Sequence, residues 1–350
     1  MSDQILMKGN EAVGEAAIIA GCRYYFAYPI TPQNEIPAYM AKRLPEVGGT
    51  FLQAESELAA INMVFGASAA GARAMTSSSS PGISLKQEGI SYIAGAELPC
   101  VIVDMMRGGP GLGNIAGSQA DYFQATRGGG NGDYRVLVIA PASVQELADM
   151  TVKAFDLADQ YSIPVMILGD GFLGQMSEPF TLPKPSGKNF KKPWALTGAK
   201  GRKPNIIASM RLTPEDLLEK HNLKLQKTYQ EIEANEVMYE SYLLDDAEYV
   251  IVAYGTSARI SRSAITELRK EGIKAGLFRP LTLWPYPYKE LKAVSERAKK
   301  VLTVEMSLGQ MVEDVRLAVQ DDAKIDFYGR TGGMLPVSEE IIRKVRSYGG

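Results

Sequence analysis

A regular alternation of strand-like and helix-like segments is the feature that most constrains how this chain can fold. From residue 9 to residue 180, short apolar runs such as LPCVIVDMM and PVMILGD alternate with longer segments of helical pattern. This alternation is typical of parallel strands joined by helical crossovers, with helices on both faces of the sheet. Strands that are apolar along their whole length are those buried on both faces. The sequence therefore predicts an α/β fold in which residues 1–180 form a doubly wound parallel sheet.

The pattern changes after residue 180 and is restored near residue 246. Residues 181–245 begin with a stretch rich in Pro, Gly and Lys and continue into a charged segment of helical pattern that extends from residue 213 to residue 244. Such composition predicts a linker followed by a charged helix. Strand patterns return in EYVIVAYG, KAGLFRP and VLTVEM, again separated by helical segments. We therefore expect residues 246–350 to form a second, smaller α/β domain.

The composition argues against several classes of partner. A hydrophobic content of 45% and a charged content of 22% are ordinary for a soluble globular protein. The net charge of −2 gives no basic field for nucleic acid. No apolar run approaches the roughly 18 residues of a membrane span, and the N-terminal residues lack the pattern of a signal peptide. We expect a cytoplasmic protein without a nucleic-acid or membrane partner.

Cysteine and histidine are too few for the commonest metal sites. Cys22 and Cys100 are far apart and outside any CxxC pattern, so we expect them to be buried and free. Two thiols cannot supply the four ligands of an ordinary iron–sulfur cluster. The single histidine, His221, lies in a charged stretch where we expect an exposed helical position. We predict no metal site in this chain and no Ser-His-Asp triad.

Glu57 is the first candidate functional residue. It follows the strand pattern TFLQA and opens a helix of small and apolar residues. A carboxylate at that position either interacts with the helix dipole or carries out acid–base chemistry, and its position alone does not decide between the two. Glu55, two residues earlier in the sequence, is the rival candidate.

Thr31 and Arg107 are two further candidates, each with a purely structural alternative. Thr31 precedes Pro32, so it fits the N-cap of a helix that begins at the proline; the same helix N-terminus could also bind a substrate carboxylate. Arg107 follows a buried strand, and ligands of open α/β sheets gather beyond the carboxyl ends of the strands. An arginine there could bind a carboxylate through two hydrogen bonds or form a surface salt bridge.

These candidates lie in segments that resemble a known family. The chain resembles the α subunit of thiamine diphosphate-dependent 2-oxoacid:ferredoxin oxidoreductases. The segments that carry the resemblance are YPITPQNE (28–35), AESELAAINMVFGAS (54–68), ARAMTSSSSPGISLKQE (72–88), MRGGPGLG (106–113), FRPLTLWPYP (278–287) and VEMSLGQMVEDVR (304–316). They follow one another in the family's order, and residues 185–212 match least well.

The resemblance implies an architecture and an activity. It implies a pyrimidine-binding domain followed by a smaller domain like the C-terminal domain of transketolase. The enzymes of this family cleave a 2-oxoacid oxidatively to an acyl-CoA and carbon dioxide and pass the electrons to ferredoxin. Thiamine diphosphate is shared with a β subunit that carries the diphosphate and magnesium, and iron–sulfur clusters lie on partner chains. The other expected partners are γ and ferredoxin-like subunits, and the multi-chain unit is expected to form a dimer.

The resemblance also implies residue roles. Glu57 matches the glutamate that hydrogen-bonds a pyrimidine ring nitrogen of the cofactor and favours its imino tautomer, which activates the thiazolium carbon. Thr31 and Arg107 match positions that contact the substrate carboxylate. The serine run 77–80 replaces a more usual Thr-Ser-Gly pattern, so we assign it no individual role.

Two glycine motifs are near misses for other cofactor sites. GDG at 169–171 resembles the metal-binding motif of thiamine diphosphate enzymes, but Asn189 is too early and Asn205 too late to complete it. We expect a glycine-bounded turn at the end of a strand instead, with the metal motif on the β subunit. The loop 108–117 fits only a loose dinucleotide pattern and does not clearly open a helix, and GxxxxGK[ST] is absent.

The substrate and the other functional classes remain open at this point. KGNEAVGEAAIIAGC (8–22) and YPITPQNE are most similar to the branched-chain enzyme that acts on 3-methyl-2-oxobutanoate. The alternative is the 2-oxoglutarate enzyme, which would need a second cation that the sequence does not place. A catalytically silent scaffold of the same fold is a further alternative. A self-sufficient transketolase-like enzyme is disfavoured by the incomplete GDG motif.

Overall fold

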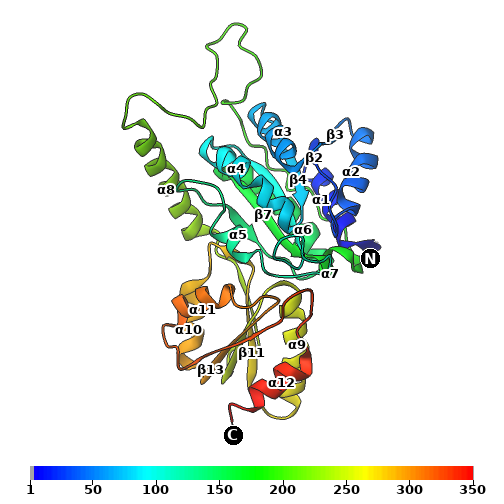
Figure 1. The fold of residues 1–350 in the computed structure, drawn as a ribbon, viewed down its shortest axis with the longest axis vertical. Helices are drawn as coiled ribbons and strands as arrows, with labels where there is room; N and C mark the ends of the chain where they lie inside the picture. The colour runs from blue at the N-terminus through cyan, green and yellow to red at the C-terminus, as the bar shows by residue number, and fades with distance from the viewer. Residues whose placement is uncertain (1–3, 350) are drawn as a thin grey trace.

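The first half of the chain supplies six strands of a seven-stranded sheet. The computed structural model describes residues 4–349 (Figure 1). The strand order is β12-β6-β7-β5-β4-β2-β3, in which every strand runs parallel to its neighbours except the edge strand β12. The bounds are β2 Tyr24–Ala27, β3 Thr50–Gln53, β4 Ala74–Ser78, β5 Cys100–Met106, β6 Leu137–Ile139, β7 Pro164–Asp170 and β12 Thr282–Trp284. The predicted doubly wound parallel sheet is thus confirmed, with one antiparallel strand added.

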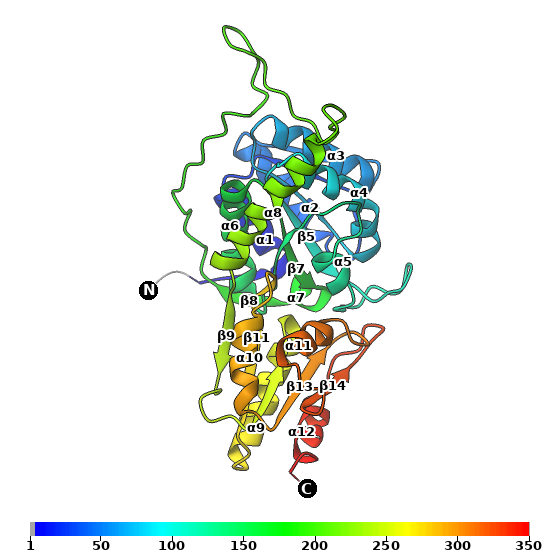
Figure 2. The same ribbon diagram turned by 90° about the vertical axis from the view of Figure 1, so that its left-hand side faces the viewer.

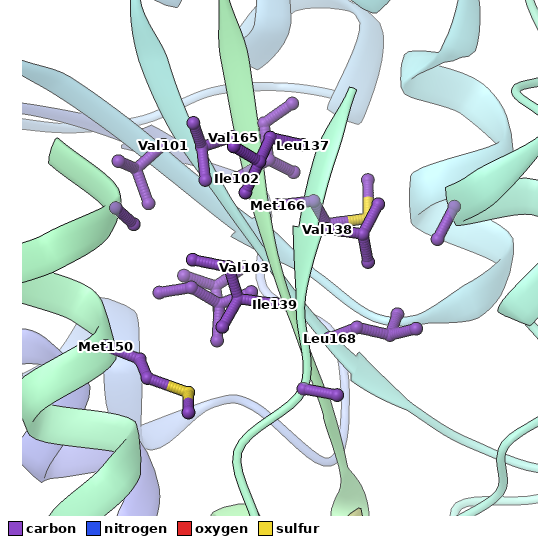
Figure 3. Packing of buried hydrophobic residues seen from close by; sticks show 14 of the residues in the cluster. Val101, Ile102, Val103, Leu137, Val138, Ile139, Met150, Val165, Met166 and Leu168 are labelled. Atoms are coloured by element: carbon purple, nitrogen blue, oxygen red, sulfur yellow. The ribbon is translucent and has the colours of Figure 1, made fainter. Parts of the chain in front are cut away.

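Helices cover this sheet on both sides (Figure 1). α1 packs against α2 and α6, and α3 packs against α4. The bounds are α1 Gly9–Ile19, α2 Glu35–Glu46, α3 Glu57–Ala69, α4 Ser80–Gly95, α5 Tyr122–Thr126, α6 Val144–Tyr161 and α7 Gly171–Gln175. Figure 3 shows the core between them, where Val101–Val103, Leu137–Ile139 and Val165–Met166 meet Met150 of α6. Because both faces of these strands are covered, they are apolar along most of their length.

The second unit is a five-stranded sheet in the order β14-β13-β10-β11-β9. β9 pairs antiparallel with β11, and the other pairs are parallel. The strands are β9 Tyr239–Tyr242, β10 Tyr249–Val252, β11 Ala275–Pro280, β13 Lys300–Glu305 and β14 Ile325–Gly329, and the helices are α9 Gly255–Lys270, α10 Tyr288–Arg297, α11 Met311–Val319 and α12 Ser338–Arg346. The expected second α/β domain is therefore present.

Two strands do not follow the domain boundaries expected from the sequence. β9 lies within residues 181–245 but belongs to the second sheet, and β12 lies within 246–350 but extends the first sheet beside β6. The charged helix, α8 (Leu217–Asn235), ends earlier than expected so that β9 can follow it. These short strands lack an apolar run of their own, and only their neighbours in space define them.

The segment between the units runs along the outside of the first one (Figure 2). It leaves β8 (Ser177–Phe180), which pairs antiparallel with β1 (Ile5–Lys8), and returns through α8. Leu196 donates its backbone N–H to the Ala69 carbonyl oxygen at 2.8 Å, which attaches the segment to the end of α3. His221 of α8 is 8% exposed, not at the surface as expected, and its Nε2 donates to the Gly95 carbonyl oxygen at 2.8 Å.

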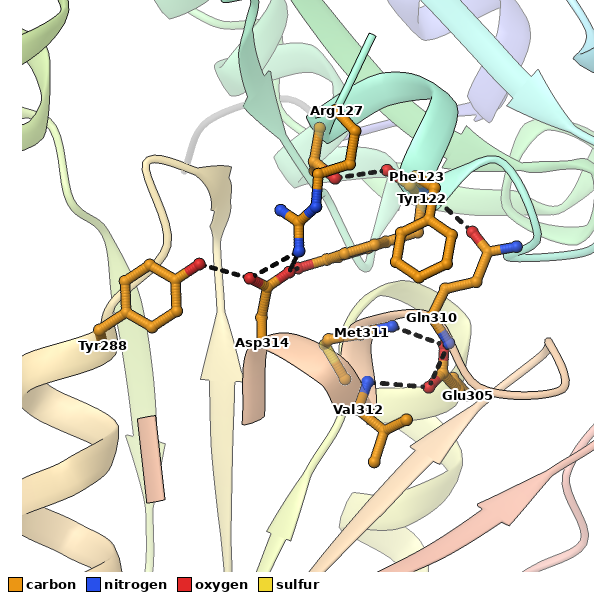
Figure 4. A network of polar contacts seen from close by, with 10 residues as sticks. Tyr122, Phe123, Arg127, Tyr288, Glu305, Gln310, Met311, Val312 and Asp314 are labelled. Atoms are coloured by element: carbon orange, nitrogen blue, oxygen red, sulfur yellow. Dashed lines mark hydrogen bonds and ion pairs between the residues drawn. The ribbon is translucent and has the colours of Figure 1, made fainter. Parts of the chain in front are cut away.

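Buried polar side chains join the two units (Figure 4). Asp314 of α11 is fully buried and accepts hydrogen bonds from the Tyr122 hydroxyl at 2.6 Å, from Arg127 Nη2 at 2.9 Å and from the Tyr288 hydroxyl. Glu305 accepts the free N–H groups at the start of α11, including that of Met311 at 3.1 Å. Because the Asp314 carboxylate is hydrogen-bonded on all sides, it fixes the position of α11 against α5, whereas Glu305 attaches the start of α11 to the end of β13.

Candidate active site

The candidate residues lie along the edge of the first sheet that the carboxyl ends of its strands form. β2, β4 and β5 are parallel neighbours, so their carboxyl ends lie at the same edge. Thr31 follows β2, the serine run extends from the end of β4 into α4, and Arg107 follows β5 directly. This edge is where parallel α/β sheets bind ligands.

Glu57 is buried at this edge, whereas Glu55 is not. Ser56 is the N-cap of α3, and its Oγ accepts a hydrogen bond from the Ala59 N–H at 3.1 Å. The cap begins the helix at Glu57, which is 6% exposed, and leaves Glu55 on the surface. No residue of the described chain, 4–349, donates a hydrogen bond to the Glu57 carboxylate. A buried carboxylate without a donor requires a partner that another molecule can supply.

The first turns of α4 lie directly against Glu57. A Cβ atom added to Gly82 would lie 2.7 Å from Glu57 Oε1 and 2.1 Å from Ser78 Oγ. Only glycine permits this approach, because any other side chain would collide with the carboxylate. Glu57, Ser78 and α4 therefore form one wall.

Several polar atoms near this wall have no hydrogen-bond partner. Ser78 Oγ, Ser79 Oγ and Lys86 Nζ are buried and unpaired. Burial lowers the pKa of Lys86 to about 8, although the negative charge of Glu57 acts in the opposite direction. Buried polar groups are rarely unpaired in folded proteins. Unpaired donors beside an unpaired acceptor are what a bound heteroaromatic ring with donor and acceptor nitrogens would satisfy, so the site fits an aminopyrimidine.

Arg107 is buried and reaches towards Thr31. Its Nη1 donates to the Thr31 carbonyl oxygen at 2.9 Å, its Nη2 donates to the Leu112 carbonyl oxygen at 3.1 Å, and its Nε is unpaired. The alternative of a surface salt bridge is therefore wrong. Two of the three candidate residues, Thr31 and Arg107, are in direct contact, and the guanidinium keeps a free donor.

Thr31 does not cap a helix. The Thr31–Pro32 peptide is cis, α2 begins only at Glu35, and its N-cap residue is Asn34. The Thr31 hydroxyl oxygen accepts a hydrogen bond from Asn34 Nδ2 at 3.1 Å. The expected helix start at Pro32 was wrong, because residues 31 and 32 form a turn and α2 begins three residues later. The hydroxyl proton of Thr31 is therefore available to another acceptor.

Ser80 is a contact of Arg107 to which the sequence analysis assigned no role. Its Oγ accepts the Arg107 N–H at 3.0 Å, and Asp121 accepts the Ser80 hydroxyl proton. The Ser80 N–H donates to Asp104 Oδ1 at 3.3 Å. Burial, with the negative charge of Asp121 as a second cause, raises the pKa of Asp104 well above its usual value. The available signal was an aspartate inside the apolar pattern VIVDMM, opposite the serine run.

The two glycine motifs have structural roles here. Asp170 of GDG is the N-cap of α7, and its Oδ1 accepts the N–H groups of Phe172 and Leu173 at 3.0 and 3.1 Å. The loop 108–117 reaches the second unit, where Asn114 Nδ2 donates to the Gly332 carbonyl oxygen at 2.7 Å. Within residues 4–349, no group of three or more His, Cys, Asp or Glu side chains is arranged for a metal ion. Cys22 and Cys100 are buried and free, as predicted.

The fold and the site define a two-domain α/β protein with a polar ligand site at the edge of its parallel sheet. Residues 15–241 match the family described as pyruvate flavodoxin/ferredoxin oxidoreductase, thiamine diphosphate-binding, and residues 247–341 match pyruvate:ferredoxin oxidoreductase core domain II. The chain belongs to this family of thiamine diphosphate-binding oxidoreductases.

Relatives cover nearly the whole chain. The ketoisovalerate oxidoreductase subunit VorB of Methanothermobacter thermautotrophicus is 50% identical over 346 residues, which are 99% of this chain and 98% of VorB. The 2-oxoglutarate synthase subunit KorA of Methanocaldococcus jannaschii is 38% identical over 363 residues, with 97% of this chain and 98% of KorA covered. The chain is similar to the α-type subunits of 2-oxoacid oxidoreductases, as its sequence motifs predicted.

Solved structures show the same fold. The 2-oxoglutarate:ferredoxin oxidoreductase from Magnetococcus marinus, with 2-oxoglutarate, coenzyme A and succinyl-CoA bound, matches with a TM-score of 0.85 and 31% identity over 99% of this chain. This chain spans 65% of that longer chain. An inactive split-gene transketolase tetramer matches with a TM-score of 0.60 at 15% identity, which shows a shared fold. None of the helices within residues 4–349 is long and apolar enough to cross a membrane.

Proposed function

We propose that this chain is the pyrimidine-binding subunit of a 2-oxoacid:ferredoxin oxidoreductase that converts 3-methyl-2-oxobutanoate and related branched-chain 2-oxoacids to acyl-CoA and carbon dioxide. The observation that carries the proposal is the Glu57 carboxylate, which is buried at the sheet edge without a donor among the described residues. The 50% identity to VorB over almost the full length of both chains supports the branched-chain substrate.

Glu57 would hold the proton of a pyrimidine ring nitrogen. When bound, thiamine diphosphate supplies a nucleophilic carbon and an electron sink for decarboxylation. The carboxylate accepts a hydrogen bond from the ring N–H, and this bond is strong because Glu57 is shielded from water. The unpaired Ser78 and Ser79 hydroxyls are available to the remaining polar atoms of the ring. Gly82 lets the backbone of α4 lie directly against the carboxylate.

Arg107 and Thr31 would bind the carboxylate of the 2-oxoacid. Arg107 retains an unpaired Nε–H and a full positive charge beside the strand end. The Thr31 hydroxyl has a free proton, because its oxygen already accepts from Asn34. Both groups could donate to one carboxylate, and a charged donor contributes more than a neutral one. Ser80 positions Arg107 through its backbone N–H.

The remaining components would come from other chains. We propose that a β subunit carries the diphosphate and magnesium, and that partner subunits carry the iron–sulfur clusters, because two buried cysteines cannot supply four thiolates. Both VorB and KorA are named as subunits, which supports a multi-chain enzyme. We further propose γ and ferredoxin-like subunits, ferredoxin as the electron acceptor, CoA as the acyl acceptor, and a dimer of the multi-chain unit.

A substrate comparison tests the proposal. The chain is co-expressed with its partner subunits. The purified complex is then assayed with CoA and a viologen dye, with 3-methyl-2-oxobutanoate, pyruvate or 2-oxoglutarate as the substrate. We expect kcat/KM for the branched acid to exceed that for 2-oxoglutarate by at least tenfold, a difference of about 1.4 kcal/mol. A preference for 2-oxoglutarate would overturn the substrate assignment in favour of the KorA-type activity. Absence of turnover with every 2-oxoacid would instead favour a silent scaffold.

A further inference from the structure

The contact between α3 and α4 places a lysine next to Glu57. A Cβ on Gly82 would meet the Glu57 carboxylate at 2.7 Å, and a Cβ on Gly89 would meet Ile61 Cγ2 at 2.4 Å. Gly82 and Gly89 therefore lie on the face of α4 that packs against α3. Lys86 is four residues after the first glycine and three before the second, so it lies on that same face. The two glycines bring the helices close together and leave Lys86 between them.

A contribution to stability does not explain why a lysine occupies position 86. Lys86 is fully buried, and its Nζ has no hydrogen-bond partner. A buried ammonium without a hydrogen bond is costly, and an apolar side chain of similar length would fill the same space without that cost. A residue that destabilises the folded state beside a functional carboxylate points to a role in function.

Glu57 is the carboxylate whose charge acts on Lys86. Three elements that pack against α4 bring carboxyl groups: Glu57 from α3, Asp104 from β5 and Asp170 from β7. Asp104 contacts the first residue of α4, and Asp170 caps α7, so both are engaged elsewhere. Burial also raises the pKa of Asp104 and of Asp170, which favours their neutral forms. Glu57 is the group whose charge acts on Lys86.

We propose that Lys86 is a positioning residue that acts through Glu57: the positive charge of its ammonium attracts the Glu57 carboxylate, which accepts the hydrogen bond from the pyrimidine ring N–H. A nearby cation favours the charged form of a carboxylate, and the effect is large in a site shielded from water. This inference rests on the proposed function of Glu57. It deepens that function by naming the buried group whose charge acts on the carboxylate.

The test compares three variants of the co-expressed complex. Lys86→Met removes the charge and keeps the length, Glu57→Gln removes the carboxylate, and Lys42→Met is the control, because Lys42 is exposed on α2. Three quantities are measured for each: the melting temperature of the purified chain, the dissociation constant for thiamine diphosphate, and the pH profile of kcat/KM. Lys86→Gln is made as well and judged by the same criteria if Lys86→Met does not fold.

We expect Lys86→Met to change stability and activity in opposite directions. The melting temperature rises because the buried charge is gone, while kcat/KM near neutral pH falls at least tenfold and the acidic limb of the pH profile moves to higher pH. Thiamine diphosphate binding weakens at least threefold, and Lys42→Met changes none of these quantities.

Two outcomes would overturn the role of Lys86. If stability and activity fall together without a shift of the acidic limb, the lysine is structural. If kcat/KM and the acidic limb stay unchanged, the lysine has no effect on Glu57. Glu57→Gln separates these outcomes from a failure of the proposed function. If that variant retains turnover, both proposals fail; if it is inactive while Lys86→Met is normal, only the inference about Lys86 fails.

Discussion

At the scale of single residues, the candidate site combines an unpaired acceptor with ionisable groups that are buried. Glu57 has no hydrogen-bond donor within the described chain. Burial disfavours the charged forms of Lys86 and Asp104. Burying such groups destabilises the folded state, and they are typical of functional sites. The effect of such a group on the free energy of unfolding can be measured across the pH range in which the group titrates.

Asp104 should make the stability of the protein fall as the pH rises. Its pKa is raised above 3.8 in the folded chain, so between that value and the raised pKa the folded state binds more protons than the unfolded state. The free energy of unfolding therefore decreases with increasing pH across this window. Asp104→Asn keeps an acceptor for the Ser80 N–H and cannot titrate. We expect its melting temperature to decline less between acidic and neutral pH than that of the wild type.

The control for this variant is Asp245→Asn, because Asp245 is exposed. Its melting temperature should follow the wild-type pH dependence. If Asp104→Asn also follows the wild-type curve, the raised pKa of Asp104 does not contribute to stability.

These residues also show what the sequence could and could not predict. Glu57, Thr31 and Arg107 were found because they lie in segments that resemble a family, and the structure brings Thr31 and Arg107 into contact. Lys86 was missed because a lysine in a helical segment normally faces solvent. Ser80 and Asp104 were missed because their contact depends on how β5 lies beside α4, and sequence patterns do not give this packing.

At the scale of elements, the close contact between α3 and α4 shapes the wall of the site. α3 is apolar around most of its circumference, and α4 faces it with two glycines. The start of α3 at Glu57 was predicted correctly from the sequence, where the strand pattern ends and small and apolar residues follow. The distance between α3 and α4 was not predicted, because the glycines of α4 set it.

Gly89→Ala should push α3 away from α4. The new methyl group would lie 2.4 Å from Ile61 Cγ2, so a side chain or a helix has to move. We expect a loss of about 1–3 kcal/mol in the free energy of unfolding, measured by denaturant titration. Thiamine diphosphate binding should weaken too, because the wall that contains Glu57 moves.

Gly66→Ala is the matched control in the same helix pair. Gly66 lies within α3, and an added Cβ would meet no atom within 4 Å. Alanine should stabilise the helix there by about 0.5–1 kcal/mol, because it loses less conformational freedom than glycine. If both alanine variants changed stability equally, the close contact at Gly89 would not be important.

At the scale of the whole molecule, the two units are fixed to each other by buried polar contacts. Gln119 Oε1 accepts from the Ser257 hydroxyl at 2.7 Å and from the Met306 N–H at 2.9 Å, while its Nε2 donates to the Tyr254 carbonyl oxygen at 2.9 Å. β12 also extends the first sheet from within the second half of the chain. The alternation of strands and helices predicted two α/β units, but it could not show these long-range contacts.

Asp314→Ala should weaken the junction between the units. It removes the acceptor of the Tyr122 hydroxyl, which is fully buried, and of Arg127, whose side chain is 38% exposed. We expect a loss of about 1–3 kcal/mol in the free energy of unfolding, because the buried Tyr122 hydroxyl loses its hydrogen-bond partner. Urea unfolding followed by fluorescence would measure it.

Asp322→Ala provides the comparison at the surface. Asp322 Oδ1 lies 3.9 Å from Arg316 Nε. This exposed ion pair should contribute less than about 1 kcal/mol to the free energy of unfolding. A similar loss of stability in both variants would mean that the buried network around Asp314 has no special role in joining the units.

The most direct test of the proposed function compares Glu57→Gln with Glu55→Gln in the complete complex. Both variants replace a carboxylate by its uncharged amide, but only Glu57 is buried at the sheet edge. The rate of 2-oxoacid-dependent viologen reduction should fall by at least about 100-fold in Glu57→Gln, because the amide is a much weaker acceptor for the pyrimidine N–H. It should stay within about twofold of wild type in Glu55→Gln. Near-normal turnover of Glu57→Gln would contradict the assigned role.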